Sequence, residues 1–360
     1  MAARRRTPRP GQRPPVTENL PPRRILQLRM ANQLLLEPAG SVPAAAERML
    51  ALQSQDLAAG RYALAQRSGK TTDRAQIDAL FASRDLVRSW TMRGTLHICA
   101  AADVRWLVRA TRQRTLKAMD SRLRALQITA ADISTAGTLV GGHVGQHGSA
   151  SRASLFALLN AHGIQTSAQR GVHLLMCLVM EGLLCLGPVP EDAGLAGQDF
   201  ILLDDLPSAD RQPAQPLQEL LRRYLAGHGP ASVRDAAWYT GQTLTQLKTA
   251  AADLGSELLR VGQDARGEDL YLPAGSLTAE LPARLPLRLL GHFDEYYLSY
   301  ADRSLVADER LRAQIGPGSN GMVKPFWLRS GKAERPWNAH TAPTDRLGAA
   351  LHQRYLEFRA

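Results

Sequence analysis

Residues 214–275 carry the clearest pattern of apolar and polar positions in the chain. Apolar residues recur there at helical spacing over three stretches, and Ser232 and Thr243 stand where helix N-caps are expected. Two short apolar runs then flank a turn-rich segment, which predicts a hairpin. The predicted helices are 217–225, 233–239 and 244–254, and the predicted strands are 257–261 and 270–272. Helices followed by a hairpin are typical of a winged helix.

The same order of helices and strands occurs twice before this segment, in a weaker form. Residues 111–206 show two helical stretches and then two short apolar runs, at 151–161, 167–184, 184–186 and 200–203. Residues 25–110 show three helical regions and then a strand pair, at 23–36, 42–52, 63–81, 87–90 and 95–99. We therefore predict a winged helix in each of these two segments as well.

Beyond residue 280 the pattern changes to short strands that are separated by prolines. Strands are expected at 287–290 and 322–328, the chain then runs through Arg335 and Trp337, and a helix is expected at 344–358. The predicted fold is mostly α with β wings, an α+β class. It has three tandem winged-helix domains (25–110, 111–206 and 214–275) and a small β-rich C-terminal domain (280–360).

Charge adds a candidate partner to this fold. The 360 residues contain 44 Lys and Arg against 33 Asp and Glu, a net charge of +11. Residues 1–24 hold seven arginines and one acid, so we expect a disordered basic arm. The arm either adds phosphate contacts or only keeps the protein soluble. Winged helices usually bind nucleic acid, although some bind only proteins.

Metal, cofactor and membrane roles are not favoured. The three cysteines form no zinc-like spacing, and His173 with Cys177 lies in an apolar stretch typical of a core. His143 and His147 sit in a glycine-rich stretch that we expect not to form a regular helix, so a metal site is not predicted there. No apolar run is long enough for a membrane span, and no cofactor is expected. A cytoplasmic protein fits these features.

Three segments carry a specific resemblance when taken in order. Gln53-Ser54-Gln55 is a Gln-x-Gln motif, residues 88–97 read Arg-Ser-Trp-Thr-Met-Arg-Gly-Thr-Leu-His, and residues 293–304 begin Phe-Asp-Glu-Tyr. Together they resemble the AlkZ/YcaQ-like winged-helix DNA glycosylases. The resemblance implies that Gln53 and Gln55 are catalytic. Without it, two glutamines that bond to backbone at a helix end would be the simpler interpretation.

Chemistry limits what two glutamines can do. Alkylation at N7 of guanine or N3 of adenine makes the base cationic and therefore a good leaving group. A neutral amide can orient a water and donate to a neighbour, but it is not a general base near neutral pH. We therefore expect a monofunctional glycosylase for cationic N-alkylated purines, with bulky N7-guanine adducts and interstrand crosslinks as candidate substrates.

Four further residues are candidates for binding DNA or the lesion: Arg93, His97, Asp294 and Arg303. The fork of Arg93 suits a phosphate or a carboxylate, and His97 either contacts the lesion or phosphate or finishes a strand. Asp294 and Glu295 are expected on a strand, where neighbours point to opposite faces, and one of them should pair with an arginine such as Arg93 or Arg303.

The aromatic content is 5%, with no cluster near Gln53 in the sequence, which predicts a shallow, open site without full extrusion of the base. The expected partner is double-stranded DNA with alkylated bases, bound by a monomer associated with the nucleoid. The alternative is a non-catalytic winged-helix DNA-binding protein, a regulator or a chromatin-associated factor.

Overall fold

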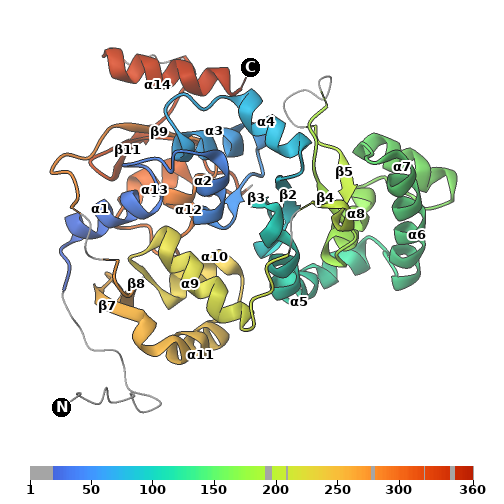
Figure 1. Ribbon diagram of the computed structural model, residues 1–360, viewed down its shortest axis with the longest axis horizontal. Helices are drawn as coiled ribbons and strands as arrows, with labels where there is room; N and C mark the ends of the chain where they lie inside the picture. The colour runs from blue at the N-terminus through green and yellow to red at the C-terminus, as the bar shows by residue number, and fades with distance from the viewer. Residues whose placement is uncertain are drawn as a thin grey trace.

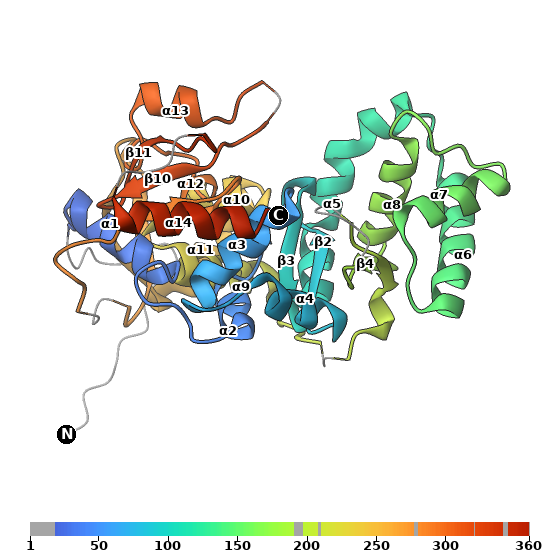
Figure 2. The same ribbon diagram turned by 90° about the horizontal axis from the view of Figure 1, so that it is seen from above.

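The computed structural model describes residues 19–190, 197–207, 210–276, 280–319, 321–340 and 345–359. Its elements form two bodies that lie side by side (Figures 1 and 2). We call the smaller body, within residues 126–207, the outer lobe; helix α5 (Ala101–Ala125) leads into it. The outer lobe comprises α6 (Ala130–His147), α7 (Arg152–Ala161), α8 (Arg170–Met180), β4 (Leu184–Leu186) and β5 (Phe200–Leu202). The short 3-10 helix Leu203–Asp205 also lies in the outer lobe, and the remaining helices and strands belong to the main body.

The predicted helices and wing of residues 214–275 are confirmed almost to the residue. Ser232 and Asp235 form a capping box at the start of α10, and Thr243 and Gln246 form another at the start of α11, which explains why these helices begin where the sequence indicates. The elements are α9 (Pro216–His228), β6 (Ala231–Ser232), α10 (Val233–Thr240), α11 (Leu244–Leu254), β7 (Leu258–Gln263) and β8 (Asp269–Pro273). Strands β7 and β8 pair as an antiparallel hairpin, with β6 on the other edge of β8.

A single five-stranded antiparallel sheet joins the main body to the outer lobe. Its order is β1-β3-β2-β4-β5, and the two halves meet where Arg88 of β2 lies opposite Leu186 of β4. The strands from the main body are β1 (Leu52–Gln53), β2 (Leu86–Trp90) and β3 (Leu96–Ala100). The first two predicted winged helices thus share a sheet, and the expected boundary after residue 110 lies inside α5. The mixed helical and β class is confirmed, while the count of three winged helices stays a prediction.

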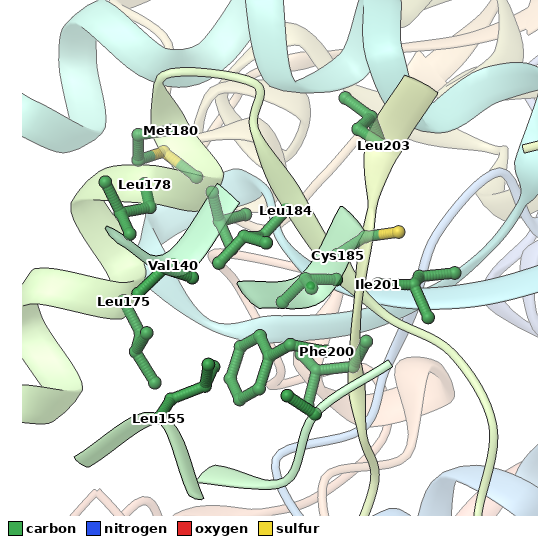
Figure 3. Close-up of a cluster of buried hydrophobic side chains, with 14 of the residues drawn as sticks. Val140, Leu155, Leu175, Leu178, Met180, Leu184, Cys185, Phe200, Ile201 and Leu203 are labelled. Carbon is green, nitrogen blue, oxygen red and sulfur yellow. The ribbon is translucent and has the colours of Figure 1, made fainter. Parts of the chain in front are cut away.

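The outer lobe is built around an apolar core (Figure 3). Leu155, Leu175 and Phe200 are among its fully buried side chains and come from three different elements. Helix α6 corrects an expectation, because the glycine-rich stretch around His143 is helical. Thr129 forms a capping box at its start, and Ala136, Val140 and Val144 recur every four residues toward the core, so packing outweighs the glycine cost.

The N-terminal part of the main body is helical, but with different bounds from those predicted. Its helices are α1 (Pro22–Asn32), α2 (Val42–Met49), α3 (Leu57–Ser68) and α4 (Arg74–Ala82). The helix expected at 42–52 ends at Met49, and the region expected at 63–81 is divided between two helices. Residues 1–18 of the expected basic arm lie outside the described residues. Residues 22–24 are not part of an arm, because Pro22 opens α1 and presets its first turn.

The C-terminal part contains the expected strands and more helix than expected. Strands β9 (Arg288–Leu290), β10 (Phe326–Arg329) and β11 (Lys332–Pro336) form one antiparallel sheet in the order β11-β10-β9. The short helices α12 (Glu295–Leu298) and α13 (Glu309–Ile315) and the strand β11 were not predicted; the final helix, α14 (Arg346–Glu357), was. Residue 344, where that helix was expected to begin, is outside the described residues.

Candidate active site

The first two motifs are adjacent in space because β1 pairs with β3. Gln53 lies opposite His97, the Ser54 N–H donates to the Leu96 carbonyl at 2.7 Å, and the Leu96 N–H donates to Gln55 Oε1 at 3.3 Å. Directly opposed residues of an antiparallel pair share a face of the sheet. Gln53 and His97 therefore belong to the same face, at the end of β3 nearest Arg93.

The third motif holds Gln53 from the other side. The Gln53 N–H donates to Glu295 Oε1 at 2.6 Å, and its side-chain Oε1 accepts a hydrogen bond from Arg93 Nη2 at 2.8 Å. Gln53 is only 7% exposed. Its backbone is thus tied to Phe-Asp-Glu-Tyr and its side chain to Arg93, and all three sequence motifs meet at this residue.

Gln55 differs from Gln53 because its side chain is exposed. Buried Arg88 fixes the chain between the two glutamines: its Nε donates to the Ser54 carbonyl at 2.9 Å and its Nη2 to the Gln55 carbonyl at 3.3 Å. Burial lowers the pKa of Arg88 to about 10, so it stays charged at neutral pH. Ser54 packs against Gly60, where a Cβ would lie 2.5 Å from the Ser54 Cβ, so this approach requires a glycine.

Arg93 sits in a tight turn with positive φ at Arg93 (57°) and Gly94 (68°). Besides Gln53, it donates to the backbone carbonyls of Trp238, at 3.2 Å, and Tyr239. Burial lowers its pKa, an effect opposed by Glu295. In this structure Arg93 joins Gln53 to α10; contact with a DNA phosphate stays a prediction.

His97 lies within β3 and is fully buried. Its Nδ1 is 3.0 Å from both Thr91 Oγ1 and the Thr95 carbonyl, while its Nε2 has no hydrogen-bond partner among the described residues. Burial, reinforced by Arg93, lowers the pKa of His97 to about 3, so the ring is neutral at physiological pH. Contact of this ring with a lesion stays a prediction.

Asp294 and Glu295 correct the expectation of a strand. Phe293 has a positive φ of 60°, Asp294 caps α12 by accepting from the Tyr296 N–H at 2.9 Å, and Glu295 is the first residue of that helix. Both carboxylates are buried, and they have separate partners. Asp294 accepts two bonds from Arg67, at 2.8 and 3.0 Å, rather than pairing with Arg93 or Arg303.

Arg67 and the contact of Glu295 with Gln53 were not found by sequence reasoning. Arg67 lies at the end of the alanine-rich helix α3, where an arginine is usually exposed, and it is buried here. Burial raises the pKa of Glu295, whose other oxygen accepts from the Ser299 hydroxyl. Only the tertiary arrangement of α3 and α12 brings these groups together.

Arg303 lies beside the site without touching the glutamines. Its Nε donates to the Tyr297 carbonyl at 3.0 Å, and its guanidinium stacks on the rings of Trp238 and Tyr297, at 5.1 and 5.2 Å from their centroids. The sequence predicts no cluster of aromatic residues near Gln53. In the structure, Arg93 contacts both Gln53 and the backbone carbonyls of Trp238 and Tyr239, so two aromatic residues from a distant part of the chain lie close to the site. The residues around Gln53 therefore come together through the tertiary fold, not through their spacing along the chain.

The described part of the chain offers neither a metal site nor a membrane span. No group of three or more His, Cys, Asp or Glu side chains there could hold a metal ion. His143 and His147 stack on one another at 4.3 Å, but they stand as a pair on α6. None of the helices described is long and apolar enough to cross a membrane.

Comparison with known families places this chain among the DNA glycosylases. Residues 46–333 match the model of the family described as "DNA glycosylase AlkZ-like", and the chain belongs to this family. A curated relative from Streptomyces sahachiroi, an interstrand DNA cross-link repair glycosylase, is 24% identical over 343 residues, covering 88% of this chain and 87% of the relative. The solved structure of Streptomyces sahachiroi DNA glycosylase AlkZ has the same fold, with a TM-score of 0.76, 20% identity, and coverage of 94% of this chain and 97% of that one.

Proposed function

We propose that this DNA glycosylase hydrolyses the N-glycosidic bond of cationic N-alkylated purines in double-stranded DNA, with Gln53 and Gln55 as its catalytic residues. The observation that supports this best is the convergence of three motifs on Gln53, through Arg93, Glu295 and the β1–β3 pairing. If the motif only ended a helix, there would be no need for a buried carboxylate to bind the Gln53 backbone and an arginine to bind its side chain.

The two glutamines divide the work according to their surroundings. Gln55, whose side chain is exposed, orients the water that attacks C1′ of the damaged nucleotide. Its Oε1 accepts from the Leu96 N–H, and a carbonyl oxygen has a second lone pair for the water. Gln53 has its Oε1 engaged by Arg93, which leaves its NH₂ group as a donor toward the sugar or the lesion. The positive charge of the alkylated base makes it a leaving group that needs no general acid.

The same arrangement restricts the substrates. Glu295, the carboxylate that contacts Gln53, is committed to the Gln53 N–H and the Ser299 hydroxyl, so it is not available as a base for water. We therefore expect excision of N7-alkylguanine and N3-alkyladenine and none of neutral damaged bases. Because Gln55 is exposed, bulky N7 adducts and interstrand crosslinks fit the site, in line with the activity named for the Streptomyces sahachiroi relative. The protein would act as a cytoplasmic, nucleoid-associated monomer.

Purified protein and a duplex with one N7-methylguanine test the proposal. Release of the free base with formation of an abasic site is expected, with a uracil-containing duplex of the same sequence as the inert control. A duplex carrying a large N7-guanine adduct should react at a comparable rate. Tight binding without any base release would contradict the proposal and favour the non-catalytic DNA-binding alternative.

A further inference from the structure

Trp238 is an exposed aromatic residue beside the proposed catalytic centre. It is 42% exposed, whereas large apolar side chains are mostly buried in folded proteins. Its carbonyl accepts from Arg93 Nη1, and the Nη2 of the same guanidinium donates to Gln53 Oε1. The Arg93 guanidinium therefore links Trp238 to Gln53.

Two contacts hold the indole ring of this exposed residue in place. Its Nε1–H donates to the Leu298 carbonyl at 2.8 Å, at the end of the helix that Glu295 opens. The Arg303 guanidinium lies over the ring, 5.1 Å from the centroid. With its edge anchored and a cation stacked on it, the ring loses little further freedom when a flat group packs against its exposed surface.

We propose that the exposed surface of Trp238 is a stacking platform for a DNA base next to the damaged nucleotide, a role that rests on the glycosylase function proposed above. Aromatic side chains stack on any base, because every base has a π face, and the basic Arg303 beside the ring favours the negative backbone. The platform would support the base stack around the lesion while the glutamines act. It does not require the lesion itself to enter an aromatic cage.

Binding of a duplex with a tetrahydrofuran abasic analogue tests this, since that duplex cannot be cleaved. Trp238→Ala should weaken binding roughly 5- to 100-fold, as expected for loss of one stacked base. Trp238→Phe keeps a ring but loses the bond to Leu298, and should bind within a few fold of the wild type. Leu347→Ala, which removes an apolar side chain that is 55% exposed on α14, is the matched control and should bind normally.

Fluorescence provides a second measurement that does not depend on the alanine variant folding. DNA should quench the wild-type emission by a component that Trp238→Phe lacks. Equal quenching in both proteins would overturn the proposal, as would wild-type affinity in Trp238→Ala. A Phe variant as weak as the Ala variant would also overturn it, because the bond to Leu298 would then be what matters. If these results hold but N7-methylguanine is not excised, the glycosylase proposal fails separately.

Discussion

The outer lobe and the surroundings of Gln53 are stabilised in different ways. In the described part of residues 126–207, the buried polar side chains are Thr166 and Gln198, and neither is charged. Around Gln53, by contrast, several ionisable side chains are buried, including Arg67, Arg88, His97, Asp294 and Glu295. One region is an ordinary apolar core, and the other is a set of hydrogen-bonded polar groups around Gln53, which we call the polar network.

This difference indicates where the sequence is constrained by chemistry. Buried charges contribute little net stability, because desolvation offsets their attraction, but removing one partner is costly. The polar network fixes the orientation of a few side chains. An apolar core, by contrast, fixes how whole helices pack, without the desolvation cost of buried charges. Substitutions in the outer lobe should therefore change stability alone, whereas those around Gln53 should change activity as well.

The largest expected effect is that of Asp294→Ala. It removes the partner of buried Arg67 and the cap of α12, and should lower the free energy of unfolding by about 3–5 kcal/mol and the excision rate with it. Leu155→Ala in the outer lobe should cost about 2–5 kcal/mol of stability. Urea denaturation measures the effect of each variant on stability. Excision, measured at a temperature where both proteins are folded, gives the effect on activity. An unchanged excision rate in folded Asp294→Ala would show that the surroundings of Gln53 respond to substitution in the same way as the outer lobe.

Glu295→Ala should affect activity next most strongly. Leaving the buried Gln53 N–H without an acceptor costs about 1–3 kcal/mol of stability. Because Gln53 is then held less well, and misplacing a catalytic group by about 1 Å can cost 10²-fold, we expect a roughly 10- to 100-fold loss in kcat. Glu295→Gln retains an acceptor oxygen and should keep most of the activity. An equal loss in both variants would show that the charge, rather than the position of Gln53, is what matters.

The pH dependence of stability gives Glu295 a signature of its own. Because burial raises its pKa above the ordinary value, the folded state holds the proton more tightly than the unfolded state. Stability from this group is thus full below the ordinary pKa and is lost as pH rises through the raised one. Relative to Glu295→Gln, the wild type should lose unfolding free energy as pH rises above about 4.5.

His97 should act in the opposite direction with pH. Its pKa of about 3 in the folded state means that stability is present above the unfolded pKa, near 6.5, and is lost as pH falls. Between these values the wild type should lose up to about 1.4 kcal/mol per pH unit more than His97→Asn. His228, also buried with a pKa lowered to about 3, is the matched control: His228→Asn should flatten the pH dependence of stability in the same way. If stability changed equally with pH in the wild type and in His97→Asn, the lowered pKa of His97 would be refuted.

The smallest effect is expected for deletion of residues 1–18. They carry five arginines and one glutamate, 5 − 1 = +4. Their loss should weaken non-specific DNA binding and flatten its salt dependence, because fewer counterions are released, while excision from saturating substrate is unchanged. Binding to undamaged duplex at several salt concentrations measures it. An unchanged slope would identify these residues as a solubilising tail.

Local patterns predicted the local structure and not the long-range contacts. The helices at 233–239 and 244–254 were predictable because caps and apolar spacing are properties of neighbouring residues. The pairing of Arg88 with Leu186 was not, because it joins segments about a hundred residues apart. The glycine-rich helix α6 was missed for the same reason, since its stability comes from the core of the outer lobe.

The candidate site was predictable to a similar degree. The motif identified Gln53 and Gln55, but their different exposure, and the roles of Glu295 and Arg67, depend on how distant helices pack. Positive φ at Phe293 turned an expected strand into a loop and a helix start. A sequence pattern gave no sign of that turn, because the residue is not a glycine.

The most direct test of this account compares Gln53→Ala/Gln55→Ala with Leu155→Ala on the N7-methylguanine duplex. The double variant should release no base while binding the duplex within a few fold of the wild type, and the outer-lobe variant should excise at the wild-type rate despite its lower stability. Excision by the double variant at the wild-type rate would contradict the account, because the chemistry would then reside outside the polar network around Gln53.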